Sequence, residues 1–233
     1  MNLFYYLQTE AAGVAADALS QQDAGQLKMP FIDLAIKGGW LMVPIVLLSI
    51  IAVYIFFERL FVIRKTTMVD RNFMDRIRDY IHEGKVDSAV KLCQSTNKPV
   101  SRMIEKGINR LGRPLQDVNA AIENVGNLEV ASLEKGLSLL ATTAGAAPML
   151  GFLGTVSGMV RAFYDMANAG NNIDIQLLSS GIYQAMVTTV AGLIVGIVAY
   201  LAYNYLVSRI NAVVNHLESS TMEFMDMLYE PVK

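Results

Sequence analysis

Three stretches of this chain contain no Asp, Glu, Lys or Arg and are predominantly apolar: residues 38–57, 136–160 and 175–208. As α-helices they would be about 30, 37 and 51 Å long, whereas the hydrocarbon core of a membrane is about 30 Å thick. The chain as a whole is also rich in hydrophobic residues (53%) and poor in charged ones (17%). The sequence therefore predicts an all-α integral membrane protein with three transmembrane helices, the last two extending beyond the lipid.

Basic residues are distributed unevenly among the segments between these stretches. Thirteen lie between Arg64 and Lys135, two precede the first stretch, and residues 162–180 have none. Because segments rich in Lys and Arg stay in the cytoplasm, we expect an inner-membrane protein with a periplasmic N-terminus and a cytoplasmic C-terminus. The expected segments are a periplasmic amphipathic helix (1–37), transmembrane helix 1 (38–63), a cytoplasmic helical region (64–135), transmembrane helix 2 (136–161), a periplasmic loop (162–178), transmembrane helix 3 (179–207) and a cytoplasmic C-terminal helix (208–233).

Apolar residues recur at heptad spacing after the third stretch. The positions are Val207, Ile210, Val214, Leu217, Phe224 and Leu228, with Thr221 in the remaining slot. Such a seam is typical of helices that pack against copies of themselves, so the tail is expected to support an oligomer.

Few residues could support catalysis or bind a metal. Cys93 is the single cysteine, and the two histidines, His82 and His216, lie outside the apolar stretches. Nucleotide-binding glycine motifs are absent, and a net charge of −2 provides no basic field for nucleic acid. We therefore expect a protein that is not an enzyme, with no catalytic residues, metal site, cofactor or nucleic-acid partner.

The second and third stretches each carry a stripe of small and polar residues. The stripe on the second contains Ala144, Pro148, Gly151, Thr155 and Gly158, with Gly154 beside it. The stripe on the third contains Gln184, Thr188, Gly192 and Gly196, with Thr189 beside it. Small residues let helix backbones approach closely, and polar groups in lipid need partners. The stripes indicate either helix packing within one subunit or the wall of a pore.

The segments APMLGFLGTVSGM and GIYQAMVTTVAGLIVGIVAYLAYNY, together with Glu58-Arg59, resemble the ExbB/TolQ/MotA family of ion-driven motor subunits. The three-span layout is more similar to ExbB or TolQ than to the four-span flagellar stator subunit. The resemblance implies a homopentamer in membrane lipid, whose second and third spans surround two single-span partners of the ExbD type, each with an intramembrane aspartate. It also implies that ion flow energises a TonB-like protein for transport across the outer membrane.

Residues 136–160 and 175–208 contain no carboxylate, so a partner has to supply the acid for proton transfer at mid-membrane. Thr155 and Thr189 are the residues we expect to face the permeating ion, followed by Thr188 and Gln184. Gln184 stands where many family members have a glutamate, and an amide cannot titrate. Glu58 and Arg59 are expected to form a salt bridge within or between subunits, or only to reach the membrane interface.

The permeating ion is expected to be H⁺ or Na⁺, and the threonines favour Na⁺. This cation needs several oxygen ligands, which Thr155, Thr188, Thr189 and the Gln184 amide would offer in an arrangement resembling sodium-driven stators. Alternatively, each threonine bonds a carbonyl of its own helix. Two other functions stay open: a structural membrane scaffold, and a TolQ-type or flagellar-stator-type motor for envelope maintenance or motility.

Overall fold

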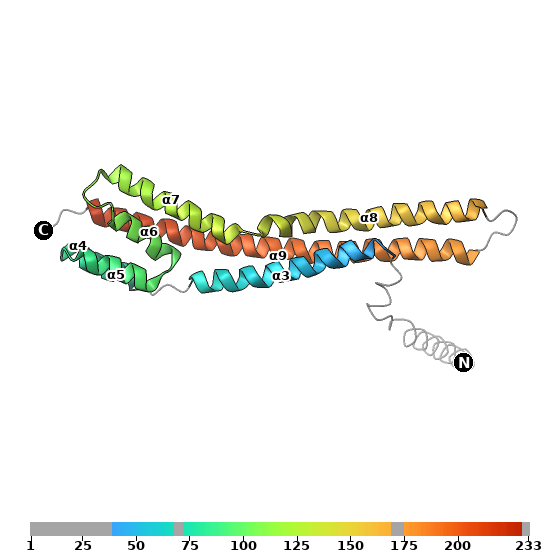
Figure 1. The fold of residues 1–233 in the computed structure, drawn as a ribbon, viewed down its shortest axis with the longest axis horizontal. Coiled ribbons are helices and arrows are strands. Elements are labelled where there is room, and N and C mark those ends of the chain that lie inside the picture. The colour runs from blue at the N-terminus through green and yellow to red at the C-terminus, as the bar shows by residue number, and fades with distance from the viewer. Residues whose placement is uncertain (1–38, 68–71, 169–174, 230–233) are drawn as a thin grey trace, which may run out of the picture. The chain divides into compact units, whose positions relative to one another are not determined.

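The computed structural model describes residues 39–67, 72–168 and 175–229 of the 233-residue chain, and every regular element within them is an α-helix (Figure 1). The helices are α3 (Met42–Thr67), α4 (Phe73–His82), α5 (Val86–Thr96), α6 (Pro99–Ile108), α7 (Leu115–Glu134), α8 (Leu137–Asn168) and α9 (Ile175–Tyr229). Stretches within α3, within α7 and α8, and within α9 are long and apolar enough to cross a membrane. The predicted all-α fold with three long apolar helices is thus confirmed, whereas the amphipathic helix predicted for residues 1–37 lies outside the described residues.

The chain divides into two compact units, and α3, α8 and α9 each contribute to both. The first unit takes residues up to Ile45 together with Leu150–Gly192. The second takes Val46–Met149 together with the chain from Leu193 onward. Both units therefore contain parts of α3, α8 and α9, and only the second contains the short helices α4–α7.

The breaks between the short helices have local causes. Helix α5 ends at Asn97, whose φ of 45° is left-handed, a conformation that asparagine tolerates better than most residues. Helix α6 begins with Pro99 in its first turn, where a missing N–H costs nothing. The Ser101 hydroxyl accepts the Lys98 backbone N–H at 2.9 Å and completes the start of this helix.

Gly136 separates α7 from α8. Its φ of 87° lies in the left-handed region, where any residue with a β-carbon is strained. Helix α8 then runs without interruption to Asn168, and α9 begins at Ile175 and continues into the C-terminal tail. The membrane boundaries predicted at residues 161 and 179 are therefore not helix boundaries.

The heptad seam of the tail is buried inside the chain. Ile210, Leu217 and Phe224 are at most 3% exposed and share one apolar core with residues of α4–α7. Phe224 reaches α6, because a β-carbon at Gly107 would come within 2.8 Å of its ring. The prediction that this seam is free to pair with copies of itself is therefore wrong, since α4–α7 of the same chain already cover it.

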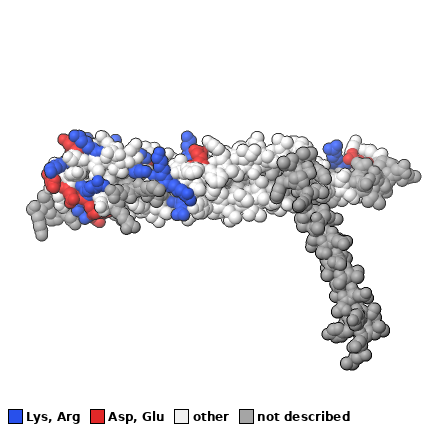
Figure 2. Space-filling view, turned by 90° about the horizontal axis from the view of Figure 1, so that it is seen from below, with Lys and Arg blue, Asp and Glu red and all other residues white. Residues whose placement is uncertain are grey.

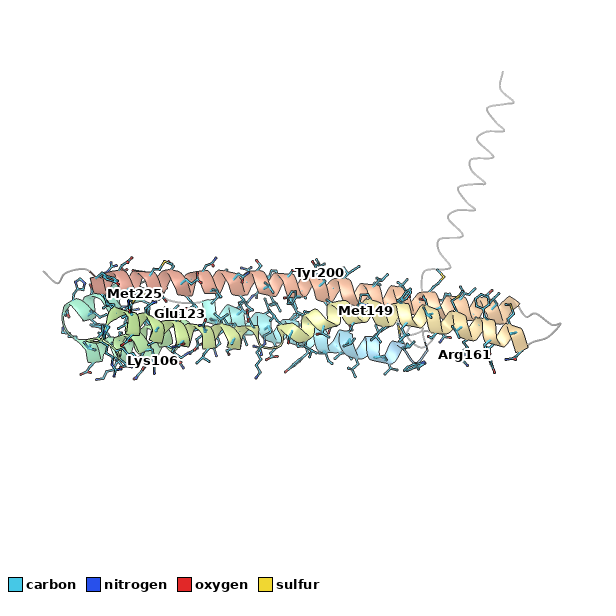
Figure 3. The ribbon with its side chains drawn as sticks, turned by 90° about the horizontal axis from the view of Figure 1, so that it is seen from above. Lys106, Glu123, Met149, Arg161, Tyr200 and Met225 are labelled. Atoms are coloured by element: carbon cyan, nitrogen blue, oxygen red, sulfur yellow. The ribbon has the colours of Figure 1, made fainter. Side chains whose placement is uncertain are left out.

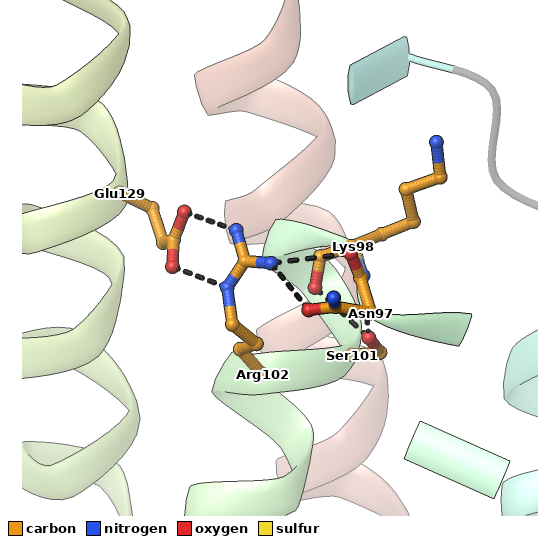
Figure 4. A network of polar contacts seen from close by, with 5 residues as sticks. All are labelled: Asn97, Lys98, Ser101, Arg102 and Glu129. Atoms are coloured by element: carbon orange, nitrogen blue, oxygen red, sulfur yellow. Dashed lines mark hydrogen bonds and ion pairs between the residues drawn. The ribbon is translucent and has the colours of Figure 1, made fainter. Parts of the chain in front are cut away.

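Charged side chains gather over the part of the second unit that contains α4–α7 (Figure 2). One network joins three elements: Arg102 of α6 donates two hydrogen bonds of 2.6 Å to the Glu129 carboxylate of α7, and further bonds to Asn97 after α5 (Figure 4). The paired Glu129 side chain is 17% exposed, so the ion pair is partly shielded from water. These bonds raise the pKa of Arg102, chiefly through its hydrogen bond to Glu129.

Candidate ion-pathway site

Three glycines of α8 allow close contact with α9 in the first unit. A β-carbon at Gly151 would lie 3.1 Å from the Thr188 carbonyl oxygen and equally close to the Thr189 α-carbon. At Gly154 it would lie 2.5 Å from the Thr188 methyl group, and at Gly158 it would lie 2.9 Å from the Ala185 side chain. The two helices therefore meet almost backbone to backbone, which gives these three glycines of α8 a structural role.

The three candidate threonines have different environments. Thr189 donates a hydrogen bond of 2.8 Å from its hydroxyl to the Gly151 carbonyl and so links α9 to α8. The Thr155 hydroxyl donates to the Phe152 carbonyl of its own helix at 2.6 Å, and the side chain stays partly exposed. Both hydroxyl oxygens keep lone pairs that can accept a hydrogen bond from water.

Thr188 is enclosed between the helices. It is 1% exposed, packs on Gly154, and its hydroxyl donates to the Gln184 carbonyl at 2.9 Å. Thr188 therefore lies at the α8–α9 contact of one chain and bonds a carbonyl of its own helix. This arrangement is the alternative to ion binding given above for each threonine.

Gln184 lies beside a polar cavity of about 310 Å³ in the first unit. Its side-chain amide is so close to the backbone before α3 that a β-carbon at Gly39 would overlap it, and Gly39 has a φ of 73°. Ser157, Arg161 and Asp165 of α8 also line this cavity. Arg161, labelled in Figure 3, is an exposed residue of α8.

Arg161 and Asp165 are residues that the sequence reasoning missed. That reasoning ended the second span at residue 161 and treated the following residues as a loop. The signal was present, because an arginine and an aspartate four residues apart lie on one face of a continuing helix. The structure adds these two charges to the cavity that Gln184 and Thr188 line.

The remaining stripe residues lie in two places. In the second unit Gly196 is packed against Pro148, and a β-carbon there would overlap the proline ring and lie 3.1 Å from the Ala144 carbonyl oxygen. Gly192 of the first unit is buried. The predicted stripes of small residues thus meet each other within one chain.

Arg59 joins α3 to the break between α7 and α8 in the second unit. Its guanidinium donates one bond of 3.1 Å to the Ser132 carbonyl and one of 2.9 Å to Glu58, and the residue is 8% exposed. Ser132 is in the last turn of α7, where carbonyls lack partners within the helix. The Glu58–Arg59 salt bridge is therefore formed within one subunit, and Arg59 also caps α7.

Comparison with known proteins finds a matching family and several relatives. The sequence model of the MotA/TolQ/ExbB proton channel family matches residues 95–219. A putative biopolymer transport protein ExbB homolog of Methanothermobacter thermautotrophicus is 30% identical over 176 residues, which are 74% of this chain and 62% of the relative. The chain therefore spans less than two thirds of that protein.

Two further relatives are aligned over more of their own length. ExbB-like protein 1 of Synechocystis is 28% identical over 206 residues, covering 86% of this chain and 81% of the relative. The Tol-Pal system protein TolQ of Haemophilus influenzae is 27% identical over 217 residues, covering 87% and 95%. The matching family is described as a proton channel family, so the comparison gives no support to sodium.

Proposed function

The chain belongs to the MotA/TolQ/ExbB proton channel family, and on that premise we propose that it is an ExbB-like motor subunit of a bacterial inner membrane. In this proposal five copies form a ring through α8 and α9, with α4–α7 in the cytoplasm. An ExbD-like single-span partner inside the ring carries the intramembrane aspartate. Ion flow then drives a TonB-like protein that energises transport across the outer membrane.

The observation that carries this proposal is that the apolar stretches of α8 and α9 carry hydroxyl groups but no acid. Residues 136–160 and 175–208 lack any carboxylate, while Thr155 and Thr189 keep hydroxyl oxygens on the closely packed α8–α9 pair. Such a wall can orient water and stabilise a passing proton, but it cannot bind the proton at mid-membrane. A carboxylate from another chain would complete the pathway.

We propose the proton as the permeating ion. Thr188, the residue that favoured sodium in the sequence, is enclosed against Gly154. A proton requires only a water chain and one titrating partner, and both are compatible with an amide at position 184. Activity of the complex with and without Na⁺, at fixed pH and fixed proton motive force, tests this choice. Loss of activity without Na⁺ would restore the sodium hypothesis.

A second system that the motor could energise is an envelope-maintenance system of the Tol-Pal type. The observation that favours it is the alignment with TolQ, which extends over 95% of that protein. Deleting the gene and measuring outer-membrane leakage alongside nutrient uptake distinguishes the two clients. Leakage with normal uptake would favour the TolQ-type role.

Substitution of Thr155 tests the proposed pathway. In proteoliposomes that contain the complex with its partner, Thr155→Val removes the hydroxyl and keeps the side-chain shape, and we expect proton flux to fall by about tenfold or more. Thr155→Ser keeps the hydroxyl and should retain most of the flux. Thr142→Val is the matched control, because Thr142 also donates to a carbonyl of its own helix, Ser138, at 2.8 Å.

The pattern across these variants decides between the hypotheses. Equal flux in wild type and Thr155→Val would assign Thr155 to helix packing alone. Absence of a copurifying chain with an intramembrane aspartate would favour the structural scaffold instead.

A further inference from the structure

An apolar groove of about 500 Å³ runs between α3 and α9 in the second unit. Ala52, Val53 and Phe56 of α3 and Val198, Ala202 and Tyr205 of α9 are among the residues that line it. From Ile194 to Tyr205 the α9 side extends about 16 Å, close to the depth of one membrane leaflet, about 15 Å. The groove therefore has the length and the lining of a site for one acyl chain.

The groove is accessible from outside the chain. Val53 is 48% exposed and Val198 is 57% exposed, although both lie in helices long and apolar enough to cross a membrane. Ser49 and Tyr205 carry the hydroxyls among the lining residues, and the rest of the lining is almost entirely apolar. A polar molecule would gain few hydrogen bonds along this length.

A positive charge lies beyond the Tyr205 end of the groove. Arg209 follows Tyr205 by one helical turn, and its guanidinium is 5.3 Å from the centre of the Tyr205 ring. Its Nε donates to the Tyr205 hydroxyl at 3.2 Å. Tyr205 thus holds Arg209 beside the groove, while the two terminal amino groups of the guanidinium, which can bind a phosphate in a fork, have no hydrogen bond among the described residues.

We propose that this groove binds one anionic membrane phospholipid. Its acyl chain lies between α3 and α9, and its headgroup phosphate contacts Arg209. The charge pattern supports this occupant over a second copy of the chain, because an acyl groove that ends at a cation complements a molecule with an apolar tail and an anionic head. Only the membrane leaflet on the side of α4–α7 can supply this lipid.

Native mass spectrometry of the full-length protein in mild detergent, with added phosphatidylglycerol, measures the bound lipid. Arg209→Gln should reduce the retained lipid about fivefold, the effect of one basic residue at a membrane surface. Arg209→Lys should retain more than Arg209→Gln, because it keeps the charge. Arg113→Gln, at an exposed position in the turn between α6 and α7, is the matched control and should behave as wild type.

Filling the groove tests the acyl chain separately. Val198→Trp adds bulk from an exposed position that lines the groove, whereas Leu193→Trp adds the same bulk at an exposed position that is not among the lining residues. Phosphatidylglycerol with a photoreactive acyl chain should crosslink to residues 49–57 and 194–205 in wild type and in Leu193→Trp. The crosslink should be lost in Val198→Trp, with helical content unchanged by circular dichroism.

Four results would overturn the proposal. One is equal lipid retention in wild type, Arg209→Gln and Val198→Trp. Another is photocrosslinking spread evenly over all three apolar helices. The third is crosslinking from position 198 to a second copy of the chain, which would make the groove a subunit interface. Displacement of the lipid by inorganic phosphate alone would likewise exclude the acyl-chain contact. None of these measurements requires ion flow, so the proposed motor function is tested independently.

Discussion

The α8–α9 contact of the first unit and the apolar core that α9 shares with α4–α7 in the second unit are held together in opposite ways. In the first, glycines bring two backbones together and Thr189 bonds directly to the Gly151 carbonyl. In the second, large apolar side chains such as Phe224 and Ile104 fill a core and are fully buried. The same helix, α9, takes part in both contacts.

The difference follows from the solvent of each region. In lipid, burying a leucine gains little, so helix association depends on close van der Waals contact and on hydrogen bonds. In water, each buried apolar side chain contributes through the hydrophobic effect. One helix can therefore require glycine in its membrane part and phenylalanine in its tail, and substitutions should have opposite tolerance in the two regions.

The largest loss of stability is expected from a substitution in the apolar core that α9 shares with α4–α7. Phe224→Ala removes a fully buried ring and should destabilise the α4–α9 core by roughly 3–5 kcal/mol, lowering the melting temperature of the full-length protein in detergent. Met222→Ala, at a 64% exposed position nearby on α9, is the control and should change little. Similar losses for both would mean that the tail is not packed in the chain's own core.

The next effect concerns the membrane contact. Gly154→Ala places a β-carbon 2.5 Å from the Thr188 methyl group, so we expect a loss of about 1–3 kcal/mol from overpacking. Gly145→Ala in the same helix meets nothing within 4 Å and should be neutral or slightly stabilising, because alanine favours helix. Thermal unfolding of both variants measures the difference. A neutral Gly154→Ala would mean that α8 and α9 are not in close contact there.

A smaller effect is expected from the Arg102 network. Arg102→Ala removes the paired bonds to Glu129 and should cost about 1–2 kcal/mol, since one partner is largely shielded from water. Arg102→Lys keeps the charge, loses the paired geometry and should recover only part of that stability. The control is Arg78→Ala. Arg78 makes one ion pair with Glu223, at 3.6 Å, and both of these side chains are more exposed than Arg102 and Glu129. Hydrogen exchange of α6 and α7 amides reports the loss, and unchanged exchange in Arg102→Ala would make the network dispensable.

Sequence patterns predicted which faces are buried better than they predicted the partners of those faces. The spacing of Gly151 and Gly158 predicted a face for close approach, because small residues let helix backbones come together in lipid, and a β-carbon at either position would lie within 3.1 Å of α9. The heptad positions around Leu217 correctly indicated an apolar seam. A seam does not specify its partner, however, and α4–α7 of the same chain satisfy it.

Contacts that depend on three-dimensional proximity were out of reach of the sequence. Arg59 lies far from Ser132 in the chain, and only the fold brings the guanidinium to the last turn of α7. Asp165 was overlooked for another reason. It lies after the end of the charge-free stretch, but α8 continues to Asn168. A charge-free stretch therefore indicates which part of a helix can lie in lipid, but it does not indicate where the helix ends.

The smallest expected effect on stability concerns Cys93, which lies in the same apolar core. Burial, with a lesser contribution from the Glu105 charge, raises the pKa of the Cys93 thiol from 9.0 to about 12. Between these values the unfolded chain loses the thiol proton while the folded chain keeps it, so the unfolded state binds fewer protons and stability falls as pH rises. From pH 8.5 to 9.5 this loss should be about 0.7 kcal/mol, and Cys93→Ala should lack it. Comparing the two melting temperatures over that pH range cancels the titration of other groups, and a thiol reagent should label the folded protein only slowly at pH 8.5. Identical pH slopes for wild type and Cys93→Ala, or rapid labelling, would mean that α5 does not bury this thiol in the apolar core.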